Sequence, residues 1–94
     1  MTATTAKLLD NFKTARLSPN RVAHLYTGAV TLTWHVDDDD DRFVAVTESA
    51  KGTSYLGVSR DGGRAEAVVL YLPEKVFAFV VNRLSALAPD WRSS

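Results

Sequence analysis

A strict alternation of apolar and polar residues over positions 29–36 constrains the fold of this chain more than any other feature. Successive side chains of a β-strand point to opposite faces, so the pattern predicts a strand with one apolar and one polar face. The apolar face carries Val30, Leu32, Trp34 and Val36, and the polar face carries Thr31, Thr33 and His35. Such a strand is half-buried and belongs to a sheet covered on one side.

Three more strands are predicted downstream, over residues 42–48, 54–59 and 65–72. The links between them are short and contain Gly52 and the pair Gly62-Gly63, and glycine supplies the positive φ that tight turns require. Consecutive strands joined by short links predict a four-stranded antiparallel meander over residues 29–72.

Helical patterns flank this meander on both sides. Residues 4–17 predict an amphipathic helix, and Pro73 opens a second helix over 73–88, followed by a tail over 89–94. Residues 19–27 predict a short helix, with a strand as the alternative interpretation. The predicted fold class is α+β, with an N-terminal helix, a short helix, the four-stranded meander and a C-terminal helix packed on the sheet.

The composition is that of an ordinary globular chain of 94 residues, which predicts a single domain over 1–94. The absence of cysteine excludes disulfides and thiolate metal sites and favours a cytoplasmic protein. No apolar run approaches the roughly 20 residues that cross a bilayer, and we expect no signal peptide. Net charge is zero, but the five aspartates at 37–41 leave the rest of the chain moderately basic, which keeps polyanion binding open.

No constellation of catalytic residues accompanies the two histidines, His24 and His35. No nucleophile motif lies near them, and nothing in the sequence brings Glu48 and Glu66 together as an acid–base pair. We therefore expect no enzymatic activity, no catalytic residue and no cofactor. The aspartate run 37–41 lacks the spaced ligands and the glycine of a calcium loop, so we expect no metal site there, and we interpret the run as a solvated loop or an acidic contact surface.

The two faces of the predicted sheet differ in composition. Besides the apolar residues of the first strand, alternation assigns to the core face Val44, Val46, Leu56, Val58, Val68, Leu70 and Leu72. It assigns to the outer face Thr31, Thr33, His35, Phe43, Ala45, Thr47, Tyr55, Ser59, Val69 and Tyr71. Three kinds of cover suit this outer face: the N-terminal helices, a second copy of the chain, or nucleobases stacked on its aromatic side chains.

The segments RFVAVTESAKGTSYLGVS (42–59) and AVVLYLPEKVFAFVVNRLSAL (67–87) resemble the whirly-like fold of the positive cofactor four, whirly and PUR families. By this resemblance, Lys51 and Gly52 would form the turn between the second and third strands, and Tyr55 and Leu56 would begin the third strand. Residues 72–74 would join the fourth strand to the helix. The resemblance covers residues 29–88. It departs from the family pattern at Gly57 and Ser59, where family members carry more basic residues.

This resemblance implies a non-enzymatic module that binds single-stranded DNA or RNA on a curved sheet, as a small homodimer assembled partly through the helices. The expected base-stacking residues are Tyr55, Phe43 and Tyr71. The expected phosphate contacts are Lys51, Arg42, Arg60 and Arg64.

The alternative interpretation is a small protein-binding module, such as a phage or bacterial inhibitor or an immunity protein. Its contact residues would be Asp37, Asp38, Asp39, Asp40, Asp41 and Phe79. The acidic loop would mimic nucleic acid or lie against a basic protein partner. Phe79 and Trp91 fall outside the predicted core, so Phe79 is interpreted as a dimer contact or as a residue beneath the N-terminal helix.

Overall fold

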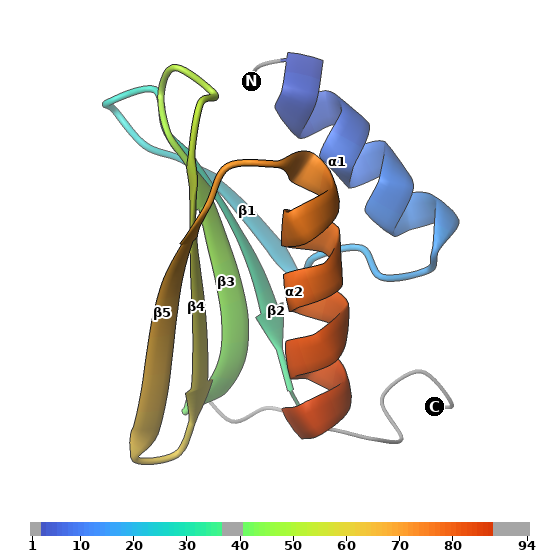
Figure 1. Cartoon of the computed structure of the whole chain (residues 1–94), viewed down its shortest axis with the longest axis vertical. Coiled ribbons are helices and arrows are strands. Elements are labelled where there is room, and N and C mark those ends of the chain that lie inside the picture. Colours follow the sequence, from blue (N-terminus) through green and yellow to red (C-terminus); the bar gives the residue numbers. More distant parts are fainter. Residues whose placement is uncertain (1–2, 37–40, 88–94) are drawn as a thin grey trace.

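The described part of the chain forms a five-stranded antiparallel sheet backed by two helices (Figure 1). The computed structural model describes residues 3–36 and 41–87. The strands follow each other in space as they do in sequence, in the order β1-β2-β3-β4-β5. The elements are α1 (Ala3–Thr14), β1 (Arg21–His24), β2 (Val30–His35), β3 (Arg42–Glu48), β4 (Tyr55–Asp61), β5 (Arg64–Leu70) and α2 (Pro73–Leu87). The predicted α+β class, with consecutive antiparallel strands and a C-terminal helix, is confirmed, although the described residues form five strands and not the predicted four.

The predicted short helix over residues 19–27 is wrong, because this segment contains β1, a fifth strand. Arg21 pairs with Thr33, and His24 pairs with Val30. A turn through Gly28, whose φ is 93°, joins the two strands. β2 bonds to β3 along one side only, so the backbone groups on its other side need partners, and β1 supplies them. Pairing with a neighbour thus outweighed the local signals for a helix.

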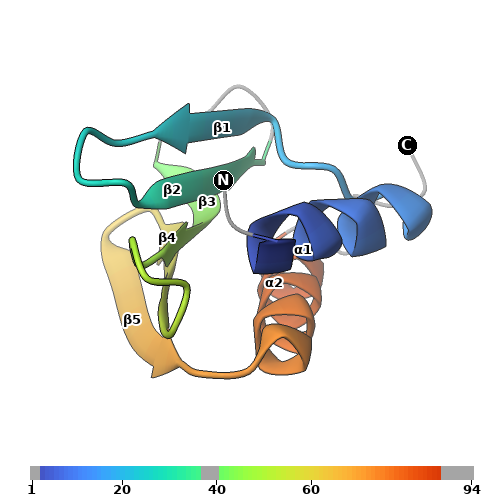
Figure 2. The same cartoon turned by 90° about the horizontal axis from the view of Figure 1, so that it is seen from above.

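Both helices lie on the same face of the sheet, which we call the inner face (Figures 1 and 2). Trp34 of β2 is fully buried there and donates a hydrogen bond of 2.6 Å from Nε1 to the Leu17 carbonyl. The Phe12 ring of α1 lies edge-on to Trp34, with centroids 4.9 Å apart, and stacks on Phe77 of α2 at 5.1 Å. The N-terminal helix therefore completes the core and leaves the opposite face of the sheet uncovered by α1.

The predicted orientation of β4 is wrong by one residue. Tyr55, Gly57 and Ser59 lie on the inner face and are buried, whereas Leu56 and Val58 lie on the outer face. A Cβ built on Gly57 would stand 2.8 Å from the Phe79 ring of α2. The helix therefore approaches β4 closely only because a glycine occupies this position, and the strand turns its glycine rather than its leucine inward.

α1 ends three residues before the predicted boundary, at Thr14. Arg16 adopts a φ of 60°, in the left-handed region. The Leu17 amide donates to the Phe12 carbonyl at 2.7 Å and the Arg16 amide to the Lys13 carbonyl at 3.0 Å, which is the pairing of a Schellman cap. This cap turns the chain so that Leu17 enters the core.

Candidate functional site

The outer face of the sheet is the candidate site, because neither helix covers it (Figure 2). The strand register assigns fourteen side chains to this face, at alternate positions on the five strands. They are Arg21, Ala23, Thr31, Thr33, His35, Phe43, Ala45, Thr47, Leu56, Val58, Arg60, Ala65, Ala67 and Val69. For Phe43, the threonines and His35 this confirms the predicted placement.

None of these fourteen side chains is a carboxylate. The acidic residues of the strands, Glu48, Asp61 and Glu66, alternate onto the inner side. The cationic residues of the outer face are Arg21 and Arg60. The strand residues of this face are therefore uncharged or basic, although the net charge of the whole chain is zero.

A row of three side chains crosses the outer face near one end of the sheet. His35 of β2 lies opposite Phe43 of β3, and Phe43 lies opposite Arg60 of β4. The rings of His35 and Phe43 are 6.2 Å apart between centroids and inclined by 55°. We call these residues the aromatic row. Neighbouring strands are about 4.8 Å apart, so the row spans roughly 10 Å and places two rings beside a guanidinium.

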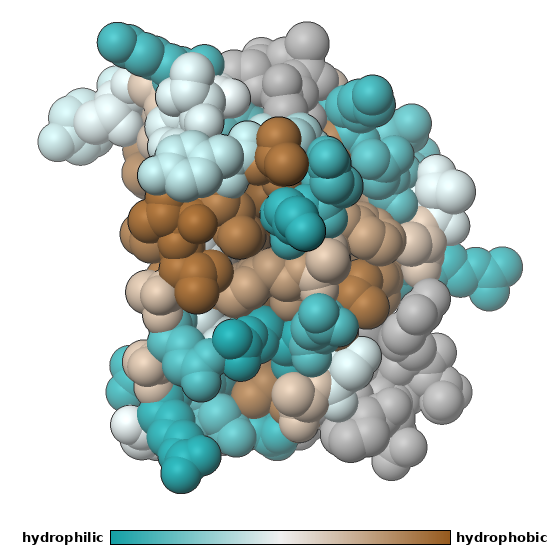
Figure 3. All heavy atoms as spheres, viewed as in Figure 1, coloured by the Kyte–Doolittle hydropathy of each residue, from teal (hydrophilic) through white to brown (hydrophobic). Residues whose placement is uncertain are grey.

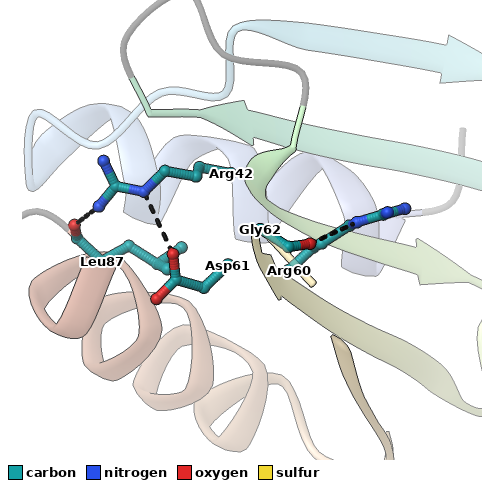
Figure 4. Close-up of polar contacts among 5 residues, drawn as sticks. All are labelled: Arg42, Arg60, Asp61, Gly62 and Leu87. Carbon is teal, nitrogen blue, oxygen red and sulfur yellow. Dashed lines mark hydrogen bonds and ion pairs between the residues drawn. The ribbon is translucent and has the colours of Figure 1, made fainter. Parts of the chain in front are cut away.

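Arg60 is partly engaged at the edge of this row (Figure 4). Its Nε donates to the Gly62 carbonyl at 3.1 Å. Its Nη2 lies 3.9 Å from the Asp41 carboxylate, and both side chains are substantially exposed. An exposed ion pair of this length is weak and exchanges readily with solvent or another anion. Arg60 is therefore open to a competing anionic group.

Arg42 does not face the outer side, contrary to its predicted role as a phosphate contact. Its guanidinium donates from Nη2 to the Leu87 carbonyl, and its Nε lies 3.3 Å from Asp61 (Figure 4). Leu87 is the last residue of α2, where carbonyls lack partners within the helix and the dipole favours a cation. Arg42 thus caps α2 and holds it to the sheet.

Tyr55 is also misplaced by the sequence-based prediction. It is only 2% exposed and lies on the inner face, opposite Glu48 of β3. Burial raises the pKa of the Tyr55 hydroxyl above its ordinary value, and the charge of Glu48 raises it further. Its hydroxyl has no hydrogen-bond partner among the described residues. Tyr55 cannot stack on a base at the outer face, and it is removed from the candidate site.

The other predicted nucleic-acid contacts are dispersed. Tyr71 is exposed beyond the end of β5, and Lys51 is exposed in the link between β3 and β4, at the end of the sheet farther from the aromatic row. Arg64 is exposed at the start of β5, at the same end as the row, but alternates onto the inner side. Of the seven predicted residues, the outer face therefore brings together Phe43 and Arg60.

Of the residues predicted to contact a protein partner, Phe79 is buried. Its ring packs on Gly57, and the Arg83 guanidinium lies 5.5 Å from its centroid. Because it is buried against β4, this side chain is not available for the predicted dimer contact. Asp37, Asp38, Asp39 and Asp40 lie outside the described residues, as does Trp91. Asp41 is described and lies near Arg60.

An apolar patch that the sequence-based prediction missed lies around the end of β5. Its members are exposed although large and apolar, namely Leu56 (45%), Val69 (56%), Tyr71 (69%) and Leu72 (50%). Figure 3 shows apolar surface gathered over the C-terminal half of this strand. Leu56 and Val69 are direct cross-strand partners on the outer face. The reversed orientation of β4 exposes Leu56, and alternation read from sequence had placed it in the core.

Two hollows lie elsewhere among the described residues, and neither is lined by a histidine. One hollow of about 580 Å³ lies between α1 and the start of α2, lined by Lys7, Asn11, Glu74 and Phe77 among others. A smaller one, of about 210 Å³, is lined by Asp61, Arg64, Glu66 and Arg83 among others. Over residues 3–36 and 41–87 there is no cluster of three or more His, Asp or Glu side chains that could hold a metal ion. Nor does any helix in these ranges have the length and apolar character needed to cross a membrane.

Comparison of the chain with protein-family models, with curated proteins and with solved structures found no match.

Proposed function

We propose that the chain is a non-enzymatic module that binds single-stranded nucleic acid on the outer face of its sheet. The observation that carries the proposal is a face that neither helix covers, whose fourteen strand side chains include no carboxylate and which displays the aromatic row His35–Phe43–Arg60. Single-strand binders combine aromatic rings for base stacking with cations that follow the backbone, and stacking tolerates any base because every base has a π-face.

The proposed contacts revise the set expected from sequence. Phe43 stacks on a base, with His35 beside it as a second ring. Arg60 binds the adjacent phosphate, or stacks through its planar guanidinium, after leaving Asp41. Arg21 adds a second cation on β1 at the other side of the face. Tyr71, Lys51 and Arg64 are peripheral contacts for a strand that extends past the ends of the sheet.

The test is fluorescence polarisation of the full chain with labelled single-stranded oligonucleotides of dT and of U. Wild type is expected to bind, with an affinity that falls steeply as salt rises. Phe43→Ala is expected to weaken binding about 5- to 150-fold, which corresponds to the loss of about 1–3 kcal/mol of stacking on one base. Phe43→Trp restores a ring and should restore binding.

Tyr26→Ala is the matched control, because Tyr26 is an aromatic side chain that is fully exposed in the β1–β2 link, away from the row. This variant should bind as wild type does. The proposal is refuted if wild type fails to bind either oligonucleotide at low salt. It is equally refuted if Phe43→Ala, shown to be folded by circular dichroism, binds unchanged.

The apolar patch of Leu56, Val69, Tyr71 and Leu72 supports a second candidate function, binding of a protein partner. In this alternative the chain is an inhibitor or immunity protein whose aspartate run 37–41 contacts a basic surface. Replacing the five aspartates with serine distinguishes the two functions, because the expected change in binding affinity is opposite for the two kinds of partner. The change removes negative charge beside Arg60, so it should tighten binding to an oligonucleotide, whereas it should abolish binding to a basic protein.

A further inference from the structure

The backbone of β5 has a free side along the edge of the sheet. The Gly62 amide donates to the Asp41 carbonyl and the Ser49 amide to the Ser54 carbonyl, so the even-numbered residues of β4 bond to β3. The odd-numbered residues of β4 therefore bond to β5, where their partners are Arg64, Glu66, Val68 and Leu70. The amides and carbonyls of Ala65, Ala67 and Val69 consequently point away from the sheet.

This edge lacks the lysine, the proline and the short length that often prevent strands from pairing. β5 is seven residues long and contains neither lysine nor proline. Its one carboxylate, Glu66, turns to the inner side and lies 2.6 Å from Arg83 of α2. By contrast, β1 at the other edge is only four residues long. Over the described residues, β5 is the long edge that is open to another strand.

The side chains along this edge favour a close and apolar contact. Ala65 and Ala67 are small and exposed, so a second backbone can approach without steric conflict on the outer face. Val69 continues this row and leads into the apolar patch with Leu56 and Tyr71. Contiguous exposed apolar surface of this kind marks a contact site more often than a site left in water.

We propose that two copies of the chain pair antiparallel through β5, forming one continuous ten-stranded sheet. The charges of β5 permit pairing with a second copy and restrict the register. The strand carries one cation, Arg64, and one anion, Glu66, so two copies do not repel one another. A register centred on Ala67 uses all seven residues and sets Glu66 opposite Val68 of the second copy. A shift of the second strand by one residue would break the backbone pairing, and a shift by two residues in one direction would set Glu66 against Glu66.

In this pairing the outer faces of the two copies lie side by side on one continuous sheet, so the dimer presents twice the outer-face surface of one chain. The inference goes beyond the proposed function and does not depend on what the outer face binds. Paired edges bury little area, at the small end of protein interfaces. We therefore expect a reversible dimer that forms as concentration rises.

Sedimentation equilibrium of the full chain without nucleic acid tests the proposal directly. The mass should rise from 10.3 kDa toward twice that value between about 1 and 300 µM protein. Val69→Lys places a charge at the pairing edge and should raise the dissociation constant at least about tenfold. Leu25→Lys is the matched control, because Leu25 is comparably exposed but lies next to β1, and it should leave the dissociation constant unchanged.

A cross-link tests the register, since the chain has no cysteine of its own. In the proposed register the two Ala67 residues form a hydrogen-bonded pair with Cα atoms about 5.5 Å apart, within the range of a disulfide. Ala67→Cys should form a disulfide dimer in mild oxidant, and Val22→Cys on β1 should not. A wild type that stays monomeric throughout overturns the proposal. So does a dimer that Val69→Lys leaves intact, because it must use another surface.

Discussion

Replacing Tyr55 with phenylalanine should stabilise the chain, although it changes a residue in the middle of the core. The Tyr55 hydroxyl is buried on the inner face and has no hydrogen-bond partner among the described residues. A buried polar group without a partner costs about 1–3 kcal/mol, because its hydrogen bonds to water are lost on folding and not replaced. Tyr55→Phe keeps the packed ring and removes this penalty, so we expect about 1 kcal/mol of added stability at pH 7.

The effect should grow at alkaline pH. Burial and the charge of Glu48 raise the pKa of Tyr55 in the folded chain above its value in the unfolded chain, which is about 10. Above that pH the unfolded state loses the phenolic proton while the folded state retains it, so the free energy of unfolding falls as pH rises. Phenylalanine has no such proton, and the difference between variant and wild type should widen above about pH 10.

Urea unfolding followed by tryptophan fluorescence, at pH 7 and at about pH 10.5, measures both effects as differences between variant and wild type. Tyr26→Phe is the control, because Tyr26 is fully exposed, and its stability should differ from wild type by less than about 0.5 kcal/mol. A Tyr55→Phe variant that is less stable than wild type at pH 7 would mean that the hydroxyl has a partner. A difference that does not change with pH would refute the titration argument.

Three further substitutions test the packing of the helices. Gly57→Ala puts a Cβ 2.8 Å from the Phe79 ring, so it should lower the free energy of unfolding in urea by about 1–3 kcal/mol. An unchanged urea midpoint would show that the ring moves freely. Arg16→Gly relieves a left-handed φ of 60° and should raise the free energy of unfolding by about 1 kcal/mol, measured by thermal unfolding. A lower thermal midpoint would contradict the assigned cap. Trp34→Phe removes the donor to the Leu17 carbonyl and should lower the free energy of unfolding by about 2–4 kcal/mol. A loss below about 1 kcal/mol would contradict a stabilising role of this hydrogen bond.

Part of the candidate site could be predicted from sequence because it depends on alternation within single strands. The pattern around Trp34 determined that Thr33 and His35 face outward, and the pattern of β3 did the same for Phe43. These assignments need no knowledge of the partner strands, since successive side chains of one strand must point to opposite faces. The outward orientation of His35 and Phe43, two of the three residues of the aromatic row, follows from this rule alone, whereas the packing of both helices on the other face decided that the outer face is not covered by them.

β4 could not be oriented in the same way. Its sequence alternates tyrosine, glycine and serine with leucine and valine, and hydrophobicity favours burying Leu56 and Val58. The structure buries Tyr55 and Gly57 instead, because α2 rests on this strand and the Phe79 ring needs the space that glycine leaves. The one-residue shift changed the candidate site, since it withdrew Tyr55 and exposed Leu56.

The sequence by itself determined the local elements whose patterns are long or regular, namely strands β2 to β5 and helix α2. Only the tertiary structure decided the role of short or ambiguous segments. Residues 21–24 form a strand because β2 offers an unpaired edge, and Arg42 caps α2 because the helix ends beside β3. The physical reason is common to both. Local periodicity acts within one element, whereas edge pairing, helix capping and close packing depend on which distant groups the fold brings into contact.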